Sequence, residues 1–179
     1  MELQSVLNAR KAIRKYDSSK KVSKEQLTEL IEAAILAPTW KNSQTGRYYV
    51  AYSQEACEKA RKCLAEFNVK NTEGASAYII ATAKKNRSGY ERDGSPTTEH
   101  EHNEWGVYDL GLESENILLK AADLGLGTLV MGIRDADALR REFDIPEDQI
   151  IMAVISVGYP AIDPERPKRK TVEDIAVFC

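Results

Sequence analysis

Apolar residues recur at helical spacing in the first part of the chain and predict two helices there. The first is marked by Leu3, Val6, Leu7 and Ile13. The second opens at Ser23, where Gln26 three residues later completes a capping box, and Pro38 ends it. Its apolar stripe is expected to be Leu27, Leu30, Ile31, Ala34 and Ile35.

Short apolar runs separated by polar turns predict strands in the next part of the chain. The loop TWKNSQTG at 39–46 leads into a strand-like run at 47–52, and SAYIIATA at 76–83 predicts a second strand. Between them Ser53 can cap a third helix with the apolar stripe Ala56, Ala60, Cys63, Leu64 and Phe67. The stretch 84–104 has almost no apolar residue, and a loop of that length is usually functional or mobile.

The last part of the chain predicts a long helix, two strands and a short helix. The long helix resumes near Trp105, Gly125 is suited to be its left-handed cap, and its apolar face is Val107, Leu110, Ser114, Ile117, Leu118 and Ala121. Strands are expected at 128–132 and 149–160, and a short helix at 135–143. Because helices come first and then alternate irregularly with strands, the expected fold class is α+β, a mixed sheet with helices packed on it.

Length and composition narrow the possible protein classes. A chain of 179 residues that is 42% hydrophobic fills one core, so we expect a single domain over residues 1–179. The net charge of -3 provides no global field for nucleic acid or an anionic membrane. No apolar run is long enough to span a membrane and the N-terminus does not resemble a signal sequence, so we expect a cytoplasmic protein.

Four cations stand within six positions of the segment ARKAIRKY at 9–16, namely Arg10, Lys11, Arg14 and Lys15. On a continuous helix Leu3, Leu7, Arg10 and Arg14 would form one stripe that begins apolar and ends cationic. Arginine suits a bidentate grip on phosphate, but cations in the last turn of a helix also complement its dipole without any ligand. A second basic element elsewhere in the chain would favour phosphate, and PERPKRK at 164–170 is a short basic tail.

Other motifs give little support to alternative chemistry. In GLGTLVMG at 125–132 the glycines follow a helix and lead into a strand, the reverse of a dinucleotide fingerprint, although Gly132 could let a ligand approach backbone N–H groups. His100 and His102 lie in a polar loop without an obvious third metal ligand. Three cysteines without a CxxC pair indicate neither a disulfide framework nor a zinc site.

Four longer segments follow one another along the chain. They are ARKAIRKY at 9–16, APTWKNSQTGRYYV at 37–50, YDLGLESENILLKAADLGLGTLVMG at 108–132 and DQIIMAVISVGYPA at 148–161. In this order they resemble the FMN-dependent nitroreductase family, as a short member, over nearly the whole chain. The resemblance implies a mixed, mainly antiparallel sheet flanked by helices. It also implies an intertwined homodimer with two FMN molecules at its interface, reduced by NADH or NADPH.

The resemblance also implies which residues would hold the flavin. Its N-terminal basic motif, for the FMN phosphate and ribityl chain, matches Arg10, Lys11 and Arg14, with Ala12 where the family usually has serine. Its flavin-contacting loop matches Asn42, Ser43 and Gln44, and the strand end facing the flavin ring matches Met131 and Gly132. Its C-terminal phosphate contact matches Lys168 and Arg169, the second basic element. Thr45 and Gly46 stand where the family usually has Pro-Trp.

The implied chemistry is hydride transfer from the nicotinamide to the flavin and then to an acceptor over the same ring face, a ping-pong cycle. No protein acid or base is required, so no catalytic side chain is assigned. One stacking site that serves two substrates in turn favours flat, electron-poor acceptors such as nitroaromatics and quinones. A flavin-binding storage or sensor protein without turnover would share the phosphate contacts, and a nucleic-acid module would need a continuous basic face.

Overall fold

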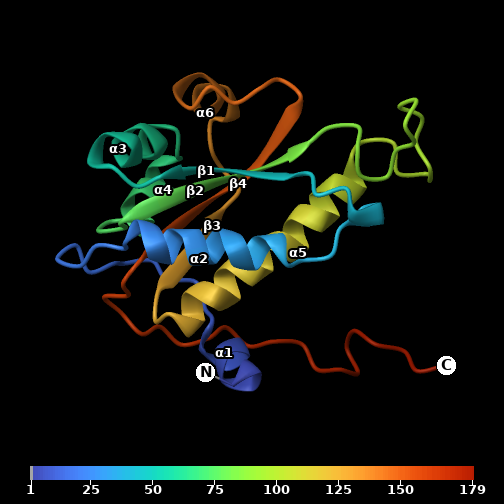
Figure 1. The fold of residues 1–179 in the computed structure, drawn as a ribbon. Helices are drawn as coiled ribbons and strands as arrows, with labels where there is room; N and C mark the ends of the chain where they lie inside the picture. Colours follow the sequence, from blue (N-terminus) through green and yellow to red (C-terminus); the bar gives the residue numbers. More distant parts are fainter. Residues whose placement is uncertain (1) are drawn as a thin grey trace.

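In the computed structural model, which describes residues 2–179, helices and strands alternate irregularly along the chain (Figure 1). In order, the elements are α1 (Leu3–Ala9), α2 (Lys24–Ile35), the 3-10 turn η1 (Trp40–Asn42), β1 (Gly46–Ala51), α3 (Gln54–Lys62), α4 (Glu66–Asn71), β2 (Ala77–Lys84), α5 (Glu104–Asp123), β3 (Gly127–Met131), α6 (Ala136–Glu142) and β4 (Gln149–Gly158). None of these helices has both the length and the apolar character needed to cross a membrane.

The four strands form one sheet in the order β1-β2-β4-β3, and each neighbouring pair is antiparallel. The central strands β2 and β4 are the most apolar runs of the sequence, and β2 is buried on both faces. A parallel contact occurs in the isolated bridge between Ala12 and Thr128. The expected α+β class with a mainly antiparallel sheet is confirmed.

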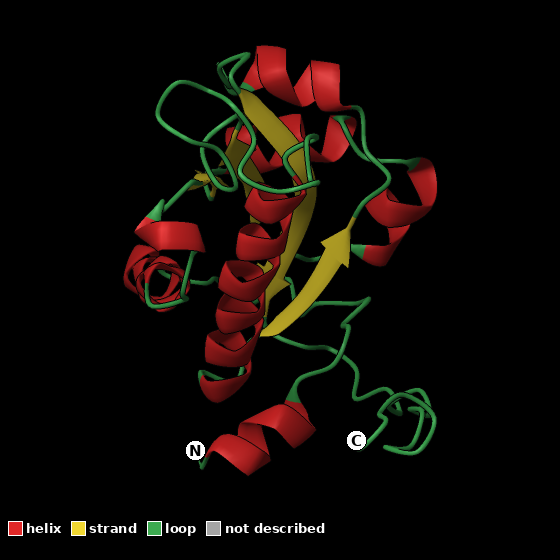
Figure 2. Ribbon diagram, turned by 90° about the vertical axis from the view of Figure 1, so that its right-hand side faces the viewer, coloured by secondary structure: helices red, strands yellow, loops and turns green. Residues whose placement is uncertain are grey.

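Helices cover both faces of the sheet, which makes three layers (Figure 1). On one face, α2 and α5 pack against Ile79, Ile155 and Val157. On the other face, α3 and α6 pack against strand residues that include Tyr78, Ile80 and Val154. The long helix α5 runs across its face of the sheet (Figure 2). Because side chains alternate along a strand, consecutive apolar residues of β2 supply both cores.

The predicted caps are present, but the third helix differs from its prediction. Ser23 and Gln26 form both bonds of the capping box of α2, and Gly125 has φ +71° after α5. The single helix expected after Ser53 is instead α3 and α4, with a break at residues 63–65. Leu64 leaves the helix to form a bridge with Arg134, and Phe67 is 51% exposed, so the helical spacing there was misleading.

The predicted stripe from Leu3 to Arg14 is wrong. Helix α1 ends at Ala9, and Arg10 already has extended backbone angles. Leu3 and Leu7 are 69% and 39% exposed, so the stripe does not begin in the core. The chain leaves the helix because residues 12–16 run beside the sheet, where the backbone N–H of Ile13 donates to the Thr128 carbonyl at 2.9 Å.

Two glycines make room for this N-terminal segment. Gly127 and Gly158 face each other across β3 and β4, and a Cβ atom on either would lie less than 3 Å from the side chain of Ile13 or Tyr16. The Tyr16 hydroxyl donates to the Ile13 carbonyl and bonds Ser156 Oγ at 2.8 Å. Residues 12–16 can therefore lie close to β3 and β4 because Gly127 and Gly158 have no side chain.

Candidate functional site

The NSQ loop, which we define as residues 39–45, has an unusual backbone. Lys41, Asn42 and Gln44 have positive φ values of 43°, 55° and 47°. Such conformations cost free energy for residues other than glycine, and they persist where surrounding contacts hold them. Within the loop, the Gln44 N–H donates to Thr39 Oγ1 and the Gln44 amide donates to Asn42 Oδ1, both at 3.1 Å.

Asp109 of α5 anchors the NSQ loop through its carboxylate. Its Oδ2 atom accepts the backbone N–H of Trp40 at 3.0 Å and faces the Ser43 hydroxyl at 3.5 Å. The Ser88 hydroxyl, from the loop that follows β2, donates to the same oxygen at 2.5 Å. The Asp109 residue is only 2% exposed, so its carboxylate depends on these donors in place of water.

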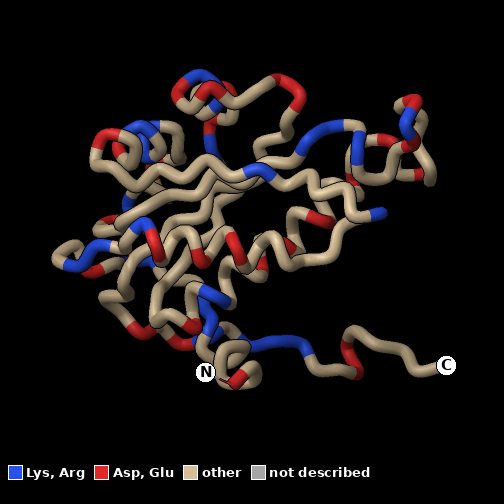
Figure 3. The backbone as a smooth tube through the Cα atoms, in the orientation of Figure 1, with Lys and Arg blue, Asp and Glu red and all other residues tan. Residues whose placement is uncertain are grey.

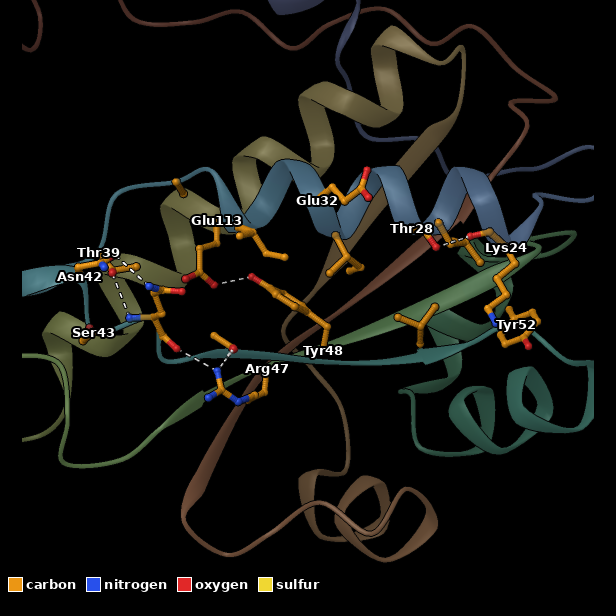
Figure 4. Close-up of a pocket in the computed structure, with 17 residues that line it drawn as sticks. Lys24, Thr28, Glu32, Thr39, Asn42, Ser43, Arg47, Tyr48, Tyr52 and Glu113 are labelled. Atoms are coloured by element: carbon orange, nitrogen blue, oxygen red, sulfur yellow. Dashed lines mark hydrogen bonds between the residues drawn. The ribbon is translucent and has the colours of Figure 1, made fainter.

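A cavity of about 810 Å³ opens beside the NSQ loop (Figure 4). Its walls come from α2, the NSQ loop, β1 and Glu113 of α5. Leu27, Ile31 and Val50 give it an apolar lining, while Asn42, Ser43 and Gln44 lie at one end. A cavity of this size, with apolar walls and a few polar groups, is typical of a site for a small organic molecule.

Glu113 brings a buried carboxyl group to the wall of this cavity. The Tyr48 hydroxyl donates to Glu113 Oε2 at 2.6 Å (Figure 4). Burial raises the pKa of Glu113 above its ordinary value. A Cβ atom on Gly46 would lie 1.7 Å from Glu113 Oε2, so the carboxyl group occupies space that any larger residue at position 46 would need.

The two basic segments of the chain lie against each other at the other end of α5 (Figure 3). Arg166 of the tail donates to the carbonyls of Leu7, Asn8 and Arg10 at 2.5, 2.8 and 2.9 Å. The Ala161 N–H donates to the Lys15 carbonyl at 3.0 Å. The tail thus caps α1 and brings Lys168 and Arg169 to the same end of the molecule as the N-terminal cations.

The cations of this basic region are not equally engaged. Arg10 Nε lies 3.7 Å from Glu115 Oε1, and the Lys11 ammonium pairs with Asp163. Within residues 2–179, the exposed side chains of Arg14 and Lys168 form no hydrogen bond or ion pair. These two side chains are therefore available to an anion.

Met131 is the last residue of β3, and Gly132 follows it directly. Met131 is buried, whereas Gly132 is exposed and has no atom within 4 Å of the position that a Cβ would take. The Gly132 carbonyl accepts from the Arg134 guanidinium at 2.7 Å. Open space at Gly132 fits the predicted approach of a ligand to the backbone.

A single chain does not bring all the predicted residues together. The NSQ loop is anchored at Asp109, whereas Arg10 and Lys11 line a small cavity with Leu118 and Ala122. At 1.5 Å per helical residue, Asp109 and Ala122 are roughly 20 Å apart along α5. The small cavity of Arg10 and Lys11 therefore lies near the C-terminal end of this helix, from which the Arg10 guanidinium reaches back to Glu115, whereas the NSQ loop is anchored nearer its N-terminal end.

A family model, described as the nitroreductase family, matches residues 7–159. The chain belongs to the nitroreductase family. A protein of Archaeoglobus fulgidus, provisionally named NADH dehydrogenase/NAD(P)H nitroreductase, is 31% identical over 89% of this chain and 86% of its own. A Bacillus subtilis protein, provisionally named NAD(P)H nitroreductase YdgI, is 27% identical over 98% of this chain and 96% of its own.

The fold agrees with the family assignment. The crystal structure of a provisionally named nitroreductase of Exiguobacterium sibiricum, in complex with FMN, superposes on this chain with a TM-score of 0.87. The two sequences are 24% identical. The comparison covers 100% of this chain and 98% of that one. The nitroreductase family is one of oxidoreductases, so electron transfer is the general class of activity of its members.

Sequence reasoning missed the two buried carboxyl groups of this nitroreductase-family chain. Asp109 and Glu113 are four residues apart and lie on the same face of α5 as the buried Leu110 and Ile117. Two acids at helical spacing within an apolar face were a visible signal. The apolar face predicted for this helix instead includes Val107 and Ser114, which are only half-buried in the structure.

The remaining candidates stay separate from the site. Within residues 2–179, His100 and His102 have no neighbouring carboxylate or thiol set that could complete a metal site. Burial raises the pKa values of the Cys57 and Cys63 thiols, and the terminal Cys179 is exposed. Asp135 caps α6 by accepting the Ala138 N–H at 2.9 Å.

Proposed function

We propose that this protein is an FMN-dependent NAD(P)H oxidoreductase that reduces nitroaromatic or quinone-like acceptors. The observation that carries the proposal is the pairing of two basic chain segments, held together by Arg166, within a nitroreductase-family fold. The names of the relatives and the FMN complex of the E. sibiricum structure support the same cofactor and reductant.

The residues present fit the phosphate group of FMN. Within residues 2–179, the exposed side chains of Arg14 and Lys168 form no hydrogen bond or ion pair, and the Arg10 guanidinium has only a long contact with Glu115. Guanidinium groups bind phosphate by charge-assisted hydrogen bonds. We assign Arg10, Lys11, Arg14, Lys168 and Arg169 to the phosphate and ribityl chain, with Ala12 contributing backbone contacts.

The flavin ring is assigned to Asn42, Ser43 and Gln44 of the NSQ loop and to the strand end at Met131 and Gly132. The left-handed backbone of the loop and the open space at Gly132 fit a flat group in close contact with main chain. Bound FMN would accept a hydride from NADH or NADPH and pass it to the acceptor. The residues of the chain would bind and orient the ring and offer backbone donors to it.

We further propose that the active form is a homodimer. The NSQ loop is anchored at Asp109, whereas the cavity of Arg10 and Lys11 lies about 20 Å further along α5, near Ala122, so we place the loop of one copy beside the basic region of another. The end of the tail extends away from the sheet (Figure 1). It exposes the apolar side chains of Val172, Ile175, Val177 and Phe178. Burial of these side chains against a second copy would favour association. A single domain over residues 1–179 and a cytoplasmic location remain predictions.

A storage or sensor protein that binds flavin without turnover is the alternative function. The test is to purify the protein, record its absorption spectrum and measure NAD(P)H oxidation with a quinone and a nitroaromatic. Our proposal predicts a flavin spectrum and acceptor-dependent oxidation. A flavin spectrum without oxidation would favour the alternative, and failure to bind added FMN would contradict both.

A further inference from the structure

We propose that Asp109 is a positioning residue that couples the loop after β2 to the NSQ loop, so that the first loop controls FMN affinity through the second. We call residues 85–103 the long loop. The inference rests on the proposed function, because the NSQ loop is assigned to the flavin ring. Asp109 itself is not assigned any contact with the cofactor.

The central observation is that donors from two loops converge on one oxygen atom. Asp109 Oδ2 accepts the Trp40 N–H of the NSQ loop and the Ser88 hydroxyl of the long loop, at 3.0 and 2.5 Å. Within residues 2–179, no lysine or arginine forms an ion pair with this carboxylate. A buried charge without a cation depends on its hydrogen-bond donors, so loss of the Ser88 bond must change the remaining bonds.

Two further contacts join the same pair of loops. The indole rings of Trp40 and Trp105 lie 4.6 Å apart, and Trp105 packs over Gly89 of the long loop, where a Cβ atom would be 2.8 Å from its ring. Lys41 pairs with Glu91 at 3.1 Å. Trp105 and Asp109 are one helical turn apart on α5, so one turn of this helix supports both loops.

The strained backbone of the NSQ loop makes its conformation dependent on the contacts with Asp109 and Trp105. Three of its residues hold left-handed conformations that are unfavourable without surrounding contacts. The Trp40 N–H that Asp109 accepts lies directly before the first of them, Lys41. Weakening this anchor should let the loop relax away from the geometry that presents Asn42, Ser43 and Gln44, and FMN affinity should fall.

The sequence offers a direct reporter of this junction. The chain has two tryptophans, Trp40 and Trp105, and both lie at the contact between the loops. Intrinsic tryptophan emission of the full-length protein therefore reports on this one place. It can be recorded with FMN absent, which separates the coupling from the proposed function.

The experiment measures FMN affinity and cofactor-free tryptophan emission for wild type, Ser88→Ala, Asp109→Asn and the double variant. Asp93→Asn is the matched control, because among residues 2–179 this long-loop carboxylate bonds only Ser95 within its own turn. The Asp109→Asn side chain keeps one carbonyl oxygen as an acceptor, so the fold should be retained. Measurements are made well below the melting temperature of each variant, so that global unfolding does not contribute.

We expect Ser88→Ala to weaken FMN binding about three- to tenfold and to shift tryptophan emission, although Ser88 belongs to neither assigned flavin segment. In the Asp109→Asn background the same change should have a smaller effect, and Asp93→Asn should match wild type. Unchanged affinity and emission in Ser88→Ala, or equal effects in both backgrounds, would overturn the coupling. If wild type fails to bind FMN, the proposed function fails, and the emission data alone decide the coupling.

Discussion

Gly46 and the Glu113 side chain compete for one small volume, so a larger residue at position 46 would require the Glu113 carboxyl group to move. The Glu113 carboxyl group fills the space beside Gly46 that a larger side chain there would need. Asp109, one turn earlier on α5, anchors the NSQ loop from the same helix face. At the scale of single residues, two carboxyl groups of α5 thus shape the NSQ loop and the cavity beside it.

Replacing Arg14 by alanine should weaken FMN binding roughly ten- to a hundredfold, because a charge-assisted hydrogen bond contributes about 1.5 to 3 kcal/mol. The fold should be retained, since Arg14 is exposed and bonds nothing else among residues 2–179. An FMN titration measures the effect. Lys15→Ala, which removes a neighbouring exposed cation without an assigned role, is the control, and equal affinities of the two variants would refute the assignment.

Glu113→Gln should stabilise the protein at neutral and alkaline pH. Burial raises the pKa of Glu113 in the folded protein, so the folded state binds its proton more tightly than the unfolded state. The wild-type free energy of unfolding should therefore fall as the pH rises from about 4.3, the unfolded value, through the raised pKa. The variant lacks this loss and its amide oxygen can still accept from Tyr48.

Denaturant unfolding of both proteins across this pH range measures the difference. The advantage of Glu113→Gln should grow with pH and vanish in acid. Glu142→Gln removes an exposed carboxylate of α6 and should show no such trend. A constant difference between wild type and Glu113→Gln at every pH would mean that Glu113 does not titrate differently on folding.

At the scale of elements, the sequence predicted a helix end well where the residues that form its cap are near neighbours in the chain. The capping box at Ser23 and the glycine after α5 fix helix ends through bonds between near neighbours, so the sequence could specify them. The ends of α1 and α3 depend on distant partners, the Thr128 carbonyl and the bridge at Arg134. Helical spacing alone contains no information about such partners.

The predicted site shows the same division. The cations at 10–14 and in the tail could be recognised as a pair from the sequence, and the bonds of Arg166 bring them together. The sequence could not indicate that the NSQ loop is anchored at Asp109, away from the cavity that Arg10 and Lys11 line near Ala122. That arrangement depends on how α5 crosses the sheet, which no short motif encodes.

The long loop should influence the choice of acceptor. Replacing residues 92–97 with two glycines retains Ser88 but shortens the part that carries the contact of Glu91 with Lys41. The ratio of KM values for a quinone and a nitroaromatic should change about threefold or more, while FMN remains bound. Steady-state kinetics with both acceptors measure this. An unchanged ratio would show that the loop does not influence the choice of acceptor.

At the scale of the whole molecule, the proposed dimeric FMN site would link cofactor binding to assembly. If FMN contacts two copies, added FMN must raise the melting temperature and shift any monomer–dimer equilibrium toward the dimer. Removing residues 172–179, with their exposed apolar side chains, should weaken the dimer. Light scattering with and without FMN measures both effects, and a stable monomer that is saturated with FMN would refute the dimeric site.

The central claim is that this family member uses bound FMN to pass electrons from a nicotinamide nucleotide to an aromatic acceptor. The most direct test mixes the FMN-loaded protein with NADH or NADPH without oxygen and follows the flavin absorption band. We predict that NADH or NADPH bleaches the flavin absorption band. The band should return when a quinone or nitroaromatic is added. A band that stays unchanged with both nucleotides would contradict the account.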